Sequence, residues 1–254
     1  MNGSDAKKAQ RVEAAAPLKE HLRALRSTLI VSLASIIAAF LLIYALAADA
    51  LLAWIVEPMR ARGVEIIYTA LSEAMITKIK VVLIAASVAA SPVVIYEMWG
   101  FVKPALYADE KRKARLLFAA SLMLFLSGVA FCYFAIYTLA IDFFLIQGEN
   151  LASPMLSVDK YVSFMFGFIV PFGVAFLMPV ALYLTSAAGL TNHQMLGAKR
   201  KYVLLGIFVL AAVLTPPDVI SQIALGVPLY LLYEVSVQVS RLAGRRAAER
   251  VRAE

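Results

Sequence analysis

Long stretches without a charged residue constrain this chain more than any other feature of its sequence. Residues 27–48, 116–141 and 161–198 form uncharged runs of 22, 26 and 38 residues. Backbone in hydrocarbon must satisfy its own hydrogen bonds, which only helices and closed barrels achieve. About 20 apolar residues suffice for a helix to cross a bilayer. With 62% hydrophobic residues, against about 45–50% in soluble proteins, we predict an all-α membrane protein.

A second span is predicted over 73–96, although its charge-free part is short. The apolar run Val81–Tyr96 reaches spanning length only if the helix begins near Glu73. Lys78 and Lys80 must then extend their ammonium groups to the membrane interface. This interpretation makes Glu73 an interfacial marker of the helix start.

The last third of the chain is expected to cross three times. The run at 161–198 is too long for one helix, and Gly189, Thr191 and Asn192 supply a stop near 188. Residues 216–218 (Pro-Pro-Asp) then separate two further apolar runs. Together with the earlier runs this gives six predicted transmembrane helices, at 27–48, 73–96, 116–141, 160–187, 202–214 and 219–240.

The distribution of basic residues predicts the orientation in the membrane. Of the 24 Lys and Arg residues, 19 lie in residues 1–27, 100–115, 188–201 and 241–254, and three lie in the opposite loops. Positive charge marks the cytoplasmic side, so both termini are expected to be cytoplasmic. No cleavable signal peptide is expected. We predict a single integral membrane domain, 1–254, made of a cytoplasmic amino-terminal segment (1–27), a six-helix bundle (28–240) and a basic tail (241–254).

Two features predict a concave, glove-like bundle with short fifth and sixth spans. The fifth run, 202–214, is roughly 20 Å long as a helix, against about 30 Å of hydrocarbon. Pro171 and Pro179 each remove a backbone hydrogen bond from the fourth span and kink it. A kinked long helix beside short ones forms a wall rather than a tight bundle.

Residues for catalysis are missing from the expected places. The sequence lacks H-E-x-x-H, G-x-S-x-G and G-x-x-x-x-G-K-[ST] motifs. Its two histidines, His21 and His193, fall on the predicted cytoplasmic face, and the single Cys132 lies in an apolar run, where a buried structural role is expected. We therefore predict a protein that is not an enzyme and that needs no metal or cofactor.

The carboxylates that remain carry two interpretations each. Asp109 and Glu110 follow an aromatic, basic loop, where they either stabilise the positive start of the third helix or offer Glu110 to a guanidinium as a bidentate partner. Glu234 either pairs across helices, with Arg241 two turns away, or serves transport chemistry. Residues 17–26 read as an amphipathic interfacial helix leading into the first span.

Several motifs, in order and spacing, resemble the TatC family, the multispanning receptor of the twin-arginine protein translocase. The resemblance covers about residues 17–242. The matching segments are EHLRALR at 20–26, SPVVIYEMWGFVKPALY at 91–107, EKR at 110–112, LSVDKY at 156–161, FGVAF at 172–176, and LTPPDV at 214–219 with Gln222.

The resemblance implies export of folded proteins that carry a twin-arginine signal, driven by the proton motive force across a bacterial inner membrane. It implies a signal-peptide-binding site on the cytoplasmic face, and TatA/TatB-type single-span partners that pack near the fifth and sixth spans in an oligomeric complex. The signal-binding residues would be Glu110, Phe101, Pro104, Arg26 and Glu20, and the partner-helix residues Thr215 and Gln222.

Two positions depart from the family pattern. Ala24 stands where a second acid is usual, and Leu177 stands where the fourth span usually carries Glu or Gln. Glu20 lies four residues before Ala24 on the same helix face, which makes it the candidate replacement for the missing acid. The alternative function is a secondary transporter for a small solute or ion, which would need convergent polar groups at mid-membrane or broken helices in matching halves.

Overall fold

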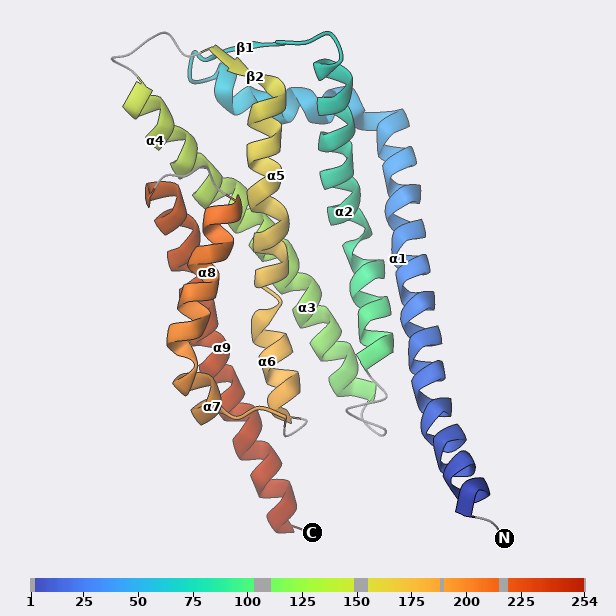
Figure 1. The fold of residues 1–254 in the computed structure, drawn as a ribbon. Coiled ribbons are helices and arrows are strands. Elements are labelled where there is room, and N and C mark those ends of the chain that lie inside the picture. The colour runs from blue at the N-terminus through green and yellow to red at the C-terminus, as the bar shows by residue number, and fades with distance from the viewer. Residues whose placement is uncertain (1–2, 103–110, 149–154, 188–189, 215–218, 254) are drawn as a thin grey trace.

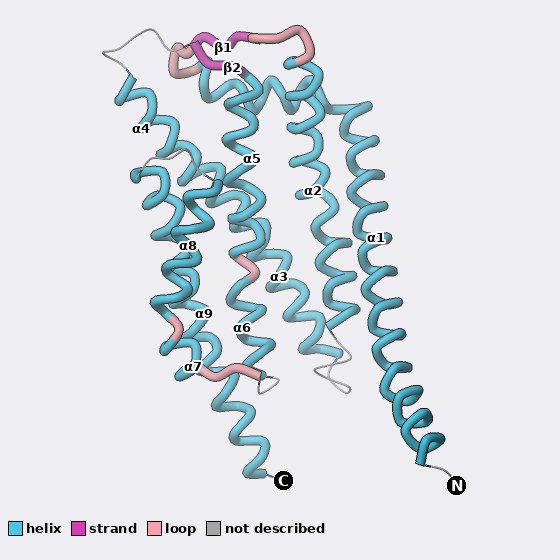
Figure 2. Tube along the Cα trace, viewed as in Figure 1, coloured by secondary structure: helices cyan, strands magenta, loops and turns pink. Residues whose placement is uncertain are grey.

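The computed structural model describes residues 3–102, 111–148, 155–187, 190–214 and 219–253, which are almost entirely helical (Figures 1 and 2). Both chain termini lie at one end of the molecule, called here the terminus end, and two short strands lie at the other, the strand end. The elements are α1 (Gly3–Arg60), β1 (Glu65–Ile67), α2 (Glu73–Val102), α3 (Lys111–Phe131), a π-helical segment (Cys132–Tyr137), α4 (Thr138–Gly148), β2 (Met155–Ser157), α5 (Val158–Ala175), α6 (Met178–Ala187), α7 (His193–Ala198), α8 (Arg200–Leu214) and α9 (Val219–Ala253).

Helix α1 continues well past its predicted end. After crossing the molecule it bends sharply and runs across the strand end (Figure 1). This last part, 49–60, is amphipathic: Ile55, Val56 and Met59 are buried, whereas Glu57 and Arg60 are exposed. Such a pattern suits a helix that lies in the membrane interface. The interpretation of 48–73 as a connecting loop was therefore wrong for its first half.

The strand end is closed by a two-stranded parallel sheet that the sequence did not predict. Strands β1 and β2 pair with Glu65 opposite Met155 and Ile67 opposite Ser157. Each strand has three residues, too few to show the period-two alternation that identifies a strand. The sheet joins the connection after α1 to the connection before α5.

Of the two kinks predicted in the fourth span, the one at Pro179 is confirmed as a break between α5 and α6, whereas α5 continues through Pro171. The chain leaves the helix at Phe176 and Leu177, and α6 begins at Met178. Pro179 has no N–H to give to the carbonyl four residues earlier, so the helical ladder stops there. Hydrogen bonds to the carbonyl three residues earlier replace it, such as the one from Leu177 N–H to Val174 O at 3.0 Å.

The middle of the molecule is held by a close approach of α3 to α5. A Cβ atom added to Gly128 of α3 would lie 2.8 Å from Phe176 Cβ and 2.9 Å from the Phe172 carbonyl oxygen. A Cβ on Gly173 of α5 would lie 2.8 Å from the Phe125 ring of α3. Small residues let two helix backbones approach in a membrane, and here both glycines serve that purpose.

Five helical stretches of the described residues are long and apolar enough to span a membrane, which supports the predicted membrane class. Helix α8 has only 15 residues, in line with the expected short fifth span, and the total of six stays a prediction. Helix α9 is longer than expected for a short sixth span, because its apolar stretch Ser221–Arg241 has 21 residues and the helix continues through the basic tail. Helices α1 and α9 also run through the predicted segment boundaries at 27/28 and 240/241.

Candidate functional site

Most residues of the predicted recognition site lie outside the part of the chain whose side chains are described. Arg26 is the exception: it is an exposed residue in the first half of α1. Glu20 lies in α1 and Phe101 in the last turn of α2, with side chains outside the described part. The remaining positions, which belong to connections outside the described residues, are Pro104, Glu110 and Thr215.

The two helices that carry the 103–110 connection are held together by a buried hydrogen bond. Trp99 on α2 is 7% exposed, and its indole Nε1–H donates to Ser121 Oγ on α3 at 3.1 Å. Ser121 in turn donates to the Leu117 carbonyl at 2.8 Å. Trp99 also packs with Ile95 of α2 and Val180 of α6 in one apolar cluster. These contacts fix where the connection begins and ends.

Leu177, the departure noted in the fourth span, lies beside this cluster. It is half-buried at the α5–α6 break and lines a small hollow of about 150 Å³ together with Trp99 and Ser121. The other residues that line this hollow come mostly from α2 and α6. The position links the broken helix to the helices that carry the 103–110 connection.

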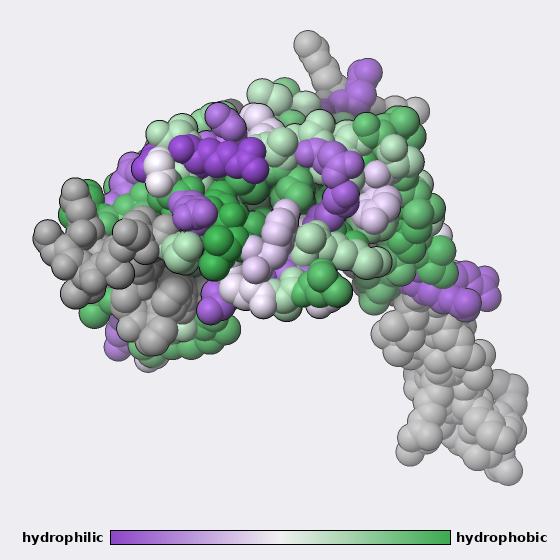
Figure 3. Space-filling view, turned by 90° about the horizontal axis from the view of Figure 1, so that it is seen from above, coloured by the Kyte–Doolittle hydropathy of each residue, from purple (hydrophilic) through white to green (hydrophobic). Residues whose placement is uncertain are grey.

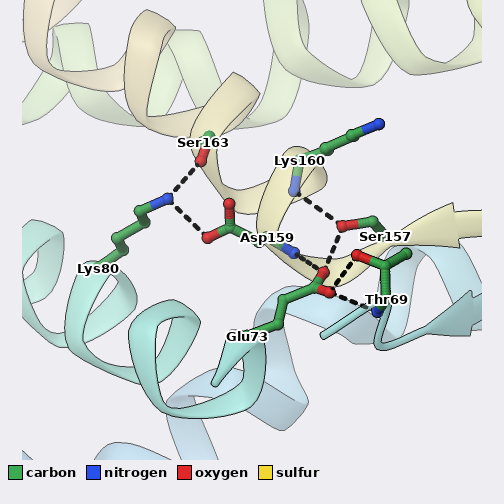
Figure 4. A network of polar contacts seen from close by, with 7 residues as sticks. All are labelled: Thr69, Glu73, Lys80, Ser157, Asp159, Lys160 and Ser163. Carbon is green, nitrogen blue, oxygen red and sulfur yellow. Dashed lines mark hydrogen bonds and ion pairs between the residues drawn. The ribbon is translucent and has the colours of Figure 1, made fainter. Parts of the chain in front are cut away.

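A buried carboxylate at the strand end joins the start of α2 to the segment before it and to the junction of β2 and α5 (Figure 4). Glu73 begins α2, as predicted, and is only 5% exposed. Its Oε2 accepts hydrogen bonds from Thr69 Oγ1 at 2.6 Å and from the Thr69 and Ala70 backbone N–H groups. Its Oε1 accepts from Ser157 Oγ and from the Asp159 N–H at 3.1 Å. An ionised carboxylate only accepts hydrogen bonds, so five donors suit the charged form.

Ion pairs complete the strand end and give both lysines of α2 a partner. The Lys80 ammonium donates to Asp159 Oδ1 at 2.6 Å and to Ser163 Oγ at 2.8 Å. Lys78 pairs with Asp49 of α1. Each pair connects α2 to a neighbouring helix and offsets the cost of a charge close to the hydrocarbon.

A further ion pair lies over the outside of this end. Arg62 Nε donates to Asp142 Oδ1 of α4 at 2.7 Å, and this hydrogen bond raises the pKa of Arg62 above its usual value. Seen from above, hydrophilic residues gather over the middle of the strand end, with hydrophobic residues around much of its rim (Figure 3). This pattern suits a polar cap on a membrane-embedded body.

The role of Glu73 could not be predicted from the sequence. A lone acid at the start of an apolar helix predicts an interfacial position, which was correct. Its partners Ser157 and Asp159 lie more than 80 residues away in the chain, and no local pattern connects them to it. The Thr69 hydroxyl four residues earlier was the available local signal.

The pairing of Glu234 across helices is confirmed, with a different partner from the one considered. Arg200 of α8 binds Glu234 of α9 through two hydrogen bonds, Nε to Oε1 at 2.6 Å and a terminal guanidinium nitrogen to Oε2 at 2.8 Å. Tyr230 adds a hydrogen bond to Oε1 at 3.1 Å. Arg241, two turns along α9, was the wrong choice, because α8 passes closer to the carboxylate.

The predicted partner-contact residue Gln222 also connects α8 to α9. Its side-chain amide donates to the Phe208 carbonyl of α8 at 2.9 Å. Opposite this bond, a Cβ added to Gly226 would lie 3.3 Å from the Phe208 ring. The two helices therefore form a closely packed pair, and Gln222 holds it from within the chain.

These contacts can hold helices and loops in place, and the charged groups that form them all pair with other groups of the fold. Cys132 is fully buried, as expected, and burial among apolar side chains makes it a poor nucleophile. Each ion pair named above joins two elements of the fold. The fold and these sites define a multispanning helical membrane protein whose ion pairs hold distant parts of the chain together.

Comparison with known proteins identifies the family. Residues 20–228 match the family model described as Sec-independent protein translocase protein (TatC). A relative with that name from Aquifex aeolicus is 40% identical over 240 residues, covering 92% of this chain and 98% of the relative. The one from Escherichia coli K12 is 35% identical, covering 91% and 90%. The chain belongs to the TatC family.

The solved structures agree. A crystal structure titled as the twin arginine translocase receptor TatC superimposes with a TM-score of 0.82 at 37% identity, covering 88% of this chain and 99% of that one. A second, in the detergent DDM, gives 0.81 at 38% identity. The chain is thus a membrane subunit of the Sec-independent protein translocase, a non-enzymatic component that works in a Tat complex with other subunits. The secondary-transporter alternative is not favoured.

Proposed function

We propose that this subunit is the signal-peptide receptor of its translocase, binding twin-arginine signals of folded cargo at the terminus end. The observation that carries the proposal is a shared location. Helix α2 ends at Val102 and α3 begins at Lys111 at the same end as both termini, and that end holds most of the Lys and Arg residues of the sequence. Positive charge favours the cytoplasmic side, where newly folded cargo is available.

Glu110 is proposed as the recognition group for a signal arginine. A carboxylate and a guanidinium form two parallel hydrogen bonds, which a lysine ammonium does not reproduce. Phe101 and Pro104 shape the connection around it, and Arg26 and Glu20 of α1 complete the site. The hydrogen bond between Trp99 and Ser121 supports this proposal, because it holds together the two helices that flank the connection, and preorganised flanking helices lose less entropy on binding.

Binding of a twin-arginine peptide to the purified full-length chain tests the proposal. Glu110→Gln should weaken binding about 10- to 100-fold, the effect of losing one charge-assisted pair of roughly 1.5–3 kcal/mol. A twin-lysine peptide should bind weakly to both proteins. The matched control is Glu57→Gln, an exposed acid at the strand end, which should not change binding. Unchanged affinity in Glu110→Gln would remove Glu110 from the site.

Ala24→Glu provides a gain-of-function test of the same site. If the arginine clamp of this chain has one acid fewer than its family, the added carboxylate should tighten binding of the twin-arginine peptide and leave the twin-lysine peptide unaffected. Glu20→Gln should weaken binding in the natural protein and have a smaller effect beside Ala24→Glu. Weaker binding by Ala24→Glu would contradict the idea that Glu20 replaces the missing acid.

We propose single-span TatA/TatB-type proteins as the other subunits, in a bacterial inner membrane, with transport driven by the proton motive force. Helix α8 supports this, because Leu205, Val209 and Val213 form an exposed apolar stripe with a spacing of four residues. A photoreactive residue at Val213 should crosslink to such a partner in native membranes, whereas one at Leu33 on the exposed face of α1 should not. Thr215 and Gln222 are the proposed polar contacts with the partner.

A further inference from the structure

An apolar groove lies beneath the interfacial part of α1. It has a volume of about 380 Å³ and is formed by α1, α2, α3, the π-helical segment and α5. Its floor consists of buried side chains such as Val81, Met165 and Ile169, and its rim of exposed ones such as Trp54, Leu126 and Phe134. The groove is therefore open on one side and closed by protein on the others.

The groove exists because small side chains face it. Ala85 and Ala89 lie one helical turn apart on α2, and Ala130 lies on α3. Larger residues at these positions would fill the space. The described residues that line the groove include none with a charge, and their polar atoms are confined to Trp54 and Tyr133.

The groove lies in the hydrocarbon region rather than in water. Its walls come from the stretches at 23–60, 73–100, 115–143 and 158–187, each long and apolar enough to span a membrane. Water gains nothing from an apolar hollow, which stays dry or takes up apolar molecules. Left empty, the lining side chains would lose their dispersion contacts on one side. The molecules available to fill it are lipid chains and apolar helices.

The shape of the groove decides between these two. Leu51, Trp54 and Ile55 line the groove from the part of α1 that runs across the strand end (Figure 1), so a straight helix crossing the membrane would meet this part of α1. A helix is about 10–12 Å wide, and roughly one turn of it would use the whole volume. A methylene takes up about the space of one water molecule, about 30 Å³, so the groove accepts roughly a dozen methylenes of a flexible chain that enters sideways.

The rim supplies a place for the polar end of such a molecule. The Trp54 indole stacks on the Tyr133 ring, with centroids 4.8 Å apart and an angle of 15° between the planes, and Trp54 is 55% exposed. Tryptophan and tyrosine favour the depth of the lipid head groups, where the ring is in contact with hydrocarbon and its N–H or O–H meets polar atoms. The ester region of a lipid would lie at this pair.

We propose that this groove is a binding site for one acyl chain of a phospholipid from the leaflet at the strand end. The π-helical segment (Cys132–Tyr137) contributes to the site, because it contains both Tyr133 and Phe134, and π-helical turns in α-helices are frequent at functional sites. The bound lipid is a component of the fold at this end and is independent of signal recognition at the terminus end.

Photolabelling of the full-length chain tests the site. The protein is reconstituted in phosphatidylcholine vesicles containing a phospholipid with a diazirine midway along one chain, irradiated, digested and mapped by mass spectrometry. We expect labels at 81–89 and 126–134 several-fold above those on the exposed face of α8. Labelling in simple proportion to exposure over all lipid-facing helices would overturn the proposal.

Filling the groove gives the second arm. Ala89→Trp with Ala130→Trp should reduce labelling at the groove to the level of α8, whereas Ala212→Trp on the exposed face of α8 should leave it unchanged. Persistent labelling in a filled and folded variant would refute the site. If the double variant does not fold, two experiments replace it. The first repeats the labelling with Ala89→Leu alone, and the second measures the phospholipid phosphate that the natural chain retains in maltoside detergent. About one retained lipid supports the proposal, and none contradicts it.

A photoreactive residue at Ala130 distinguishes lipid from protein as the occupant. In native membranes it should capture phospholipid. Specific capture of a single-span helix or of a twin-arginine peptide at this position would show that the groove serves a protein partner and would overturn the proposal.

Discussion

The close approach of α3 to α5 predicts that Gly128→Ala is destabilising, although alanine is a better helix former than glycine. The new Cβ would lie 2.7 Å from Phe176 Cγ, 2.8 Å from Phe176 Cβ and 2.9 Å from the Phe172 carbonyl oxygen. Comfortable carbon contacts are about 3.5–4.0 Å. Rotation of the Phe176 ring cannot relieve the clash, because two of these atoms belong to the backbone or are attached directly to it. The helices must move apart by about 1 Å.

Overpacking of this kind costs about 1–3 kcal/mol, and the rigid neighbours place it in the upper part of that range. The gain in helix propensity returns up to about 1 kcal/mol. The net loss is about 2 kcal/mol, which lowers the midpoint of thermal unfolding by about 4–8 °C in a protein of this size. The assay is thermal unfolding in one mild detergent at one scan rate, because membrane proteins often unfold irreversibly.

Gly206→Ala on α8 is the matched control. A Cβ at Gly206 meets nothing within 4 Å, so this substitution should leave the midpoint unchanged or raise it slightly. Phe176→Leu should not rescue Gly128→Ala, since leucine keeps both the Cβ and the Cγ that cause the clash. Equal midpoints for Gly128→Ala and Gly206→Ala would refute the packing argument.

Three further predictions concern the polar contacts. Glu73→Gln should accelerate hydrogen exchange in residues 65–70 and 155–159, because the amide turns a donor towards backbone N–H groups. The exposed Glu57→Gln should not accelerate it. Equal exchange in both variants would show that the Glu73 hydrogen bonds do not hold the loops. Ser121→Ala leaves the buried indole N–H of α2 without its acceptor at a cost of about 1–3 kcal/mol, so thermal unfolding should shift downward and twin-arginine binding weaken. Arg200→Lys should cost less than about 1 kcal/mol, because its pair with Glu234 is partly exposed; a larger loss measured by the same thermal assay would contradict this.

Much of the fold could be predicted because hydrophobic runs and prolines act locally. The order of residues alone predicted the start of α2 at Glu73 and the break near Pro179. It also predicted that both chain termini lie at the same end of the molecule. The interfacial part of α1 was missed because its apolar stripe is continuous with the span before it. Strands β1 and β2 were missed because a pair of three-residue strands is stabilised by its surroundings, which a local pattern does not record.

The candidate sites divide in the same manner. The proposed recognition residues Phe101, Pro104 and Glu110 could be predicted because they sit close together in sequence, within motifs that resemble those of the TatC family. The carboxylate network of Glu73 could not be foreseen, since its donors come from residues 69–70 and 157–159. The pair of Glu234 with Arg200 could not be predicted, because it depends on how α8 packs against α9, and the separation of the two residues in sequence does not determine that packing.

By itself the sequence determined the class of the protein and its family, and it predicted the orientation, because membrane insertion depends on runs of apolar residues and on the side that carries the cations. The tertiary structure alone decided which charges pair, where two glycines bring helices together, and where alanines leave a groove beneath α1. These properties depend on distances between segments far apart in the chain, and such distances are fixed only when the helices pack.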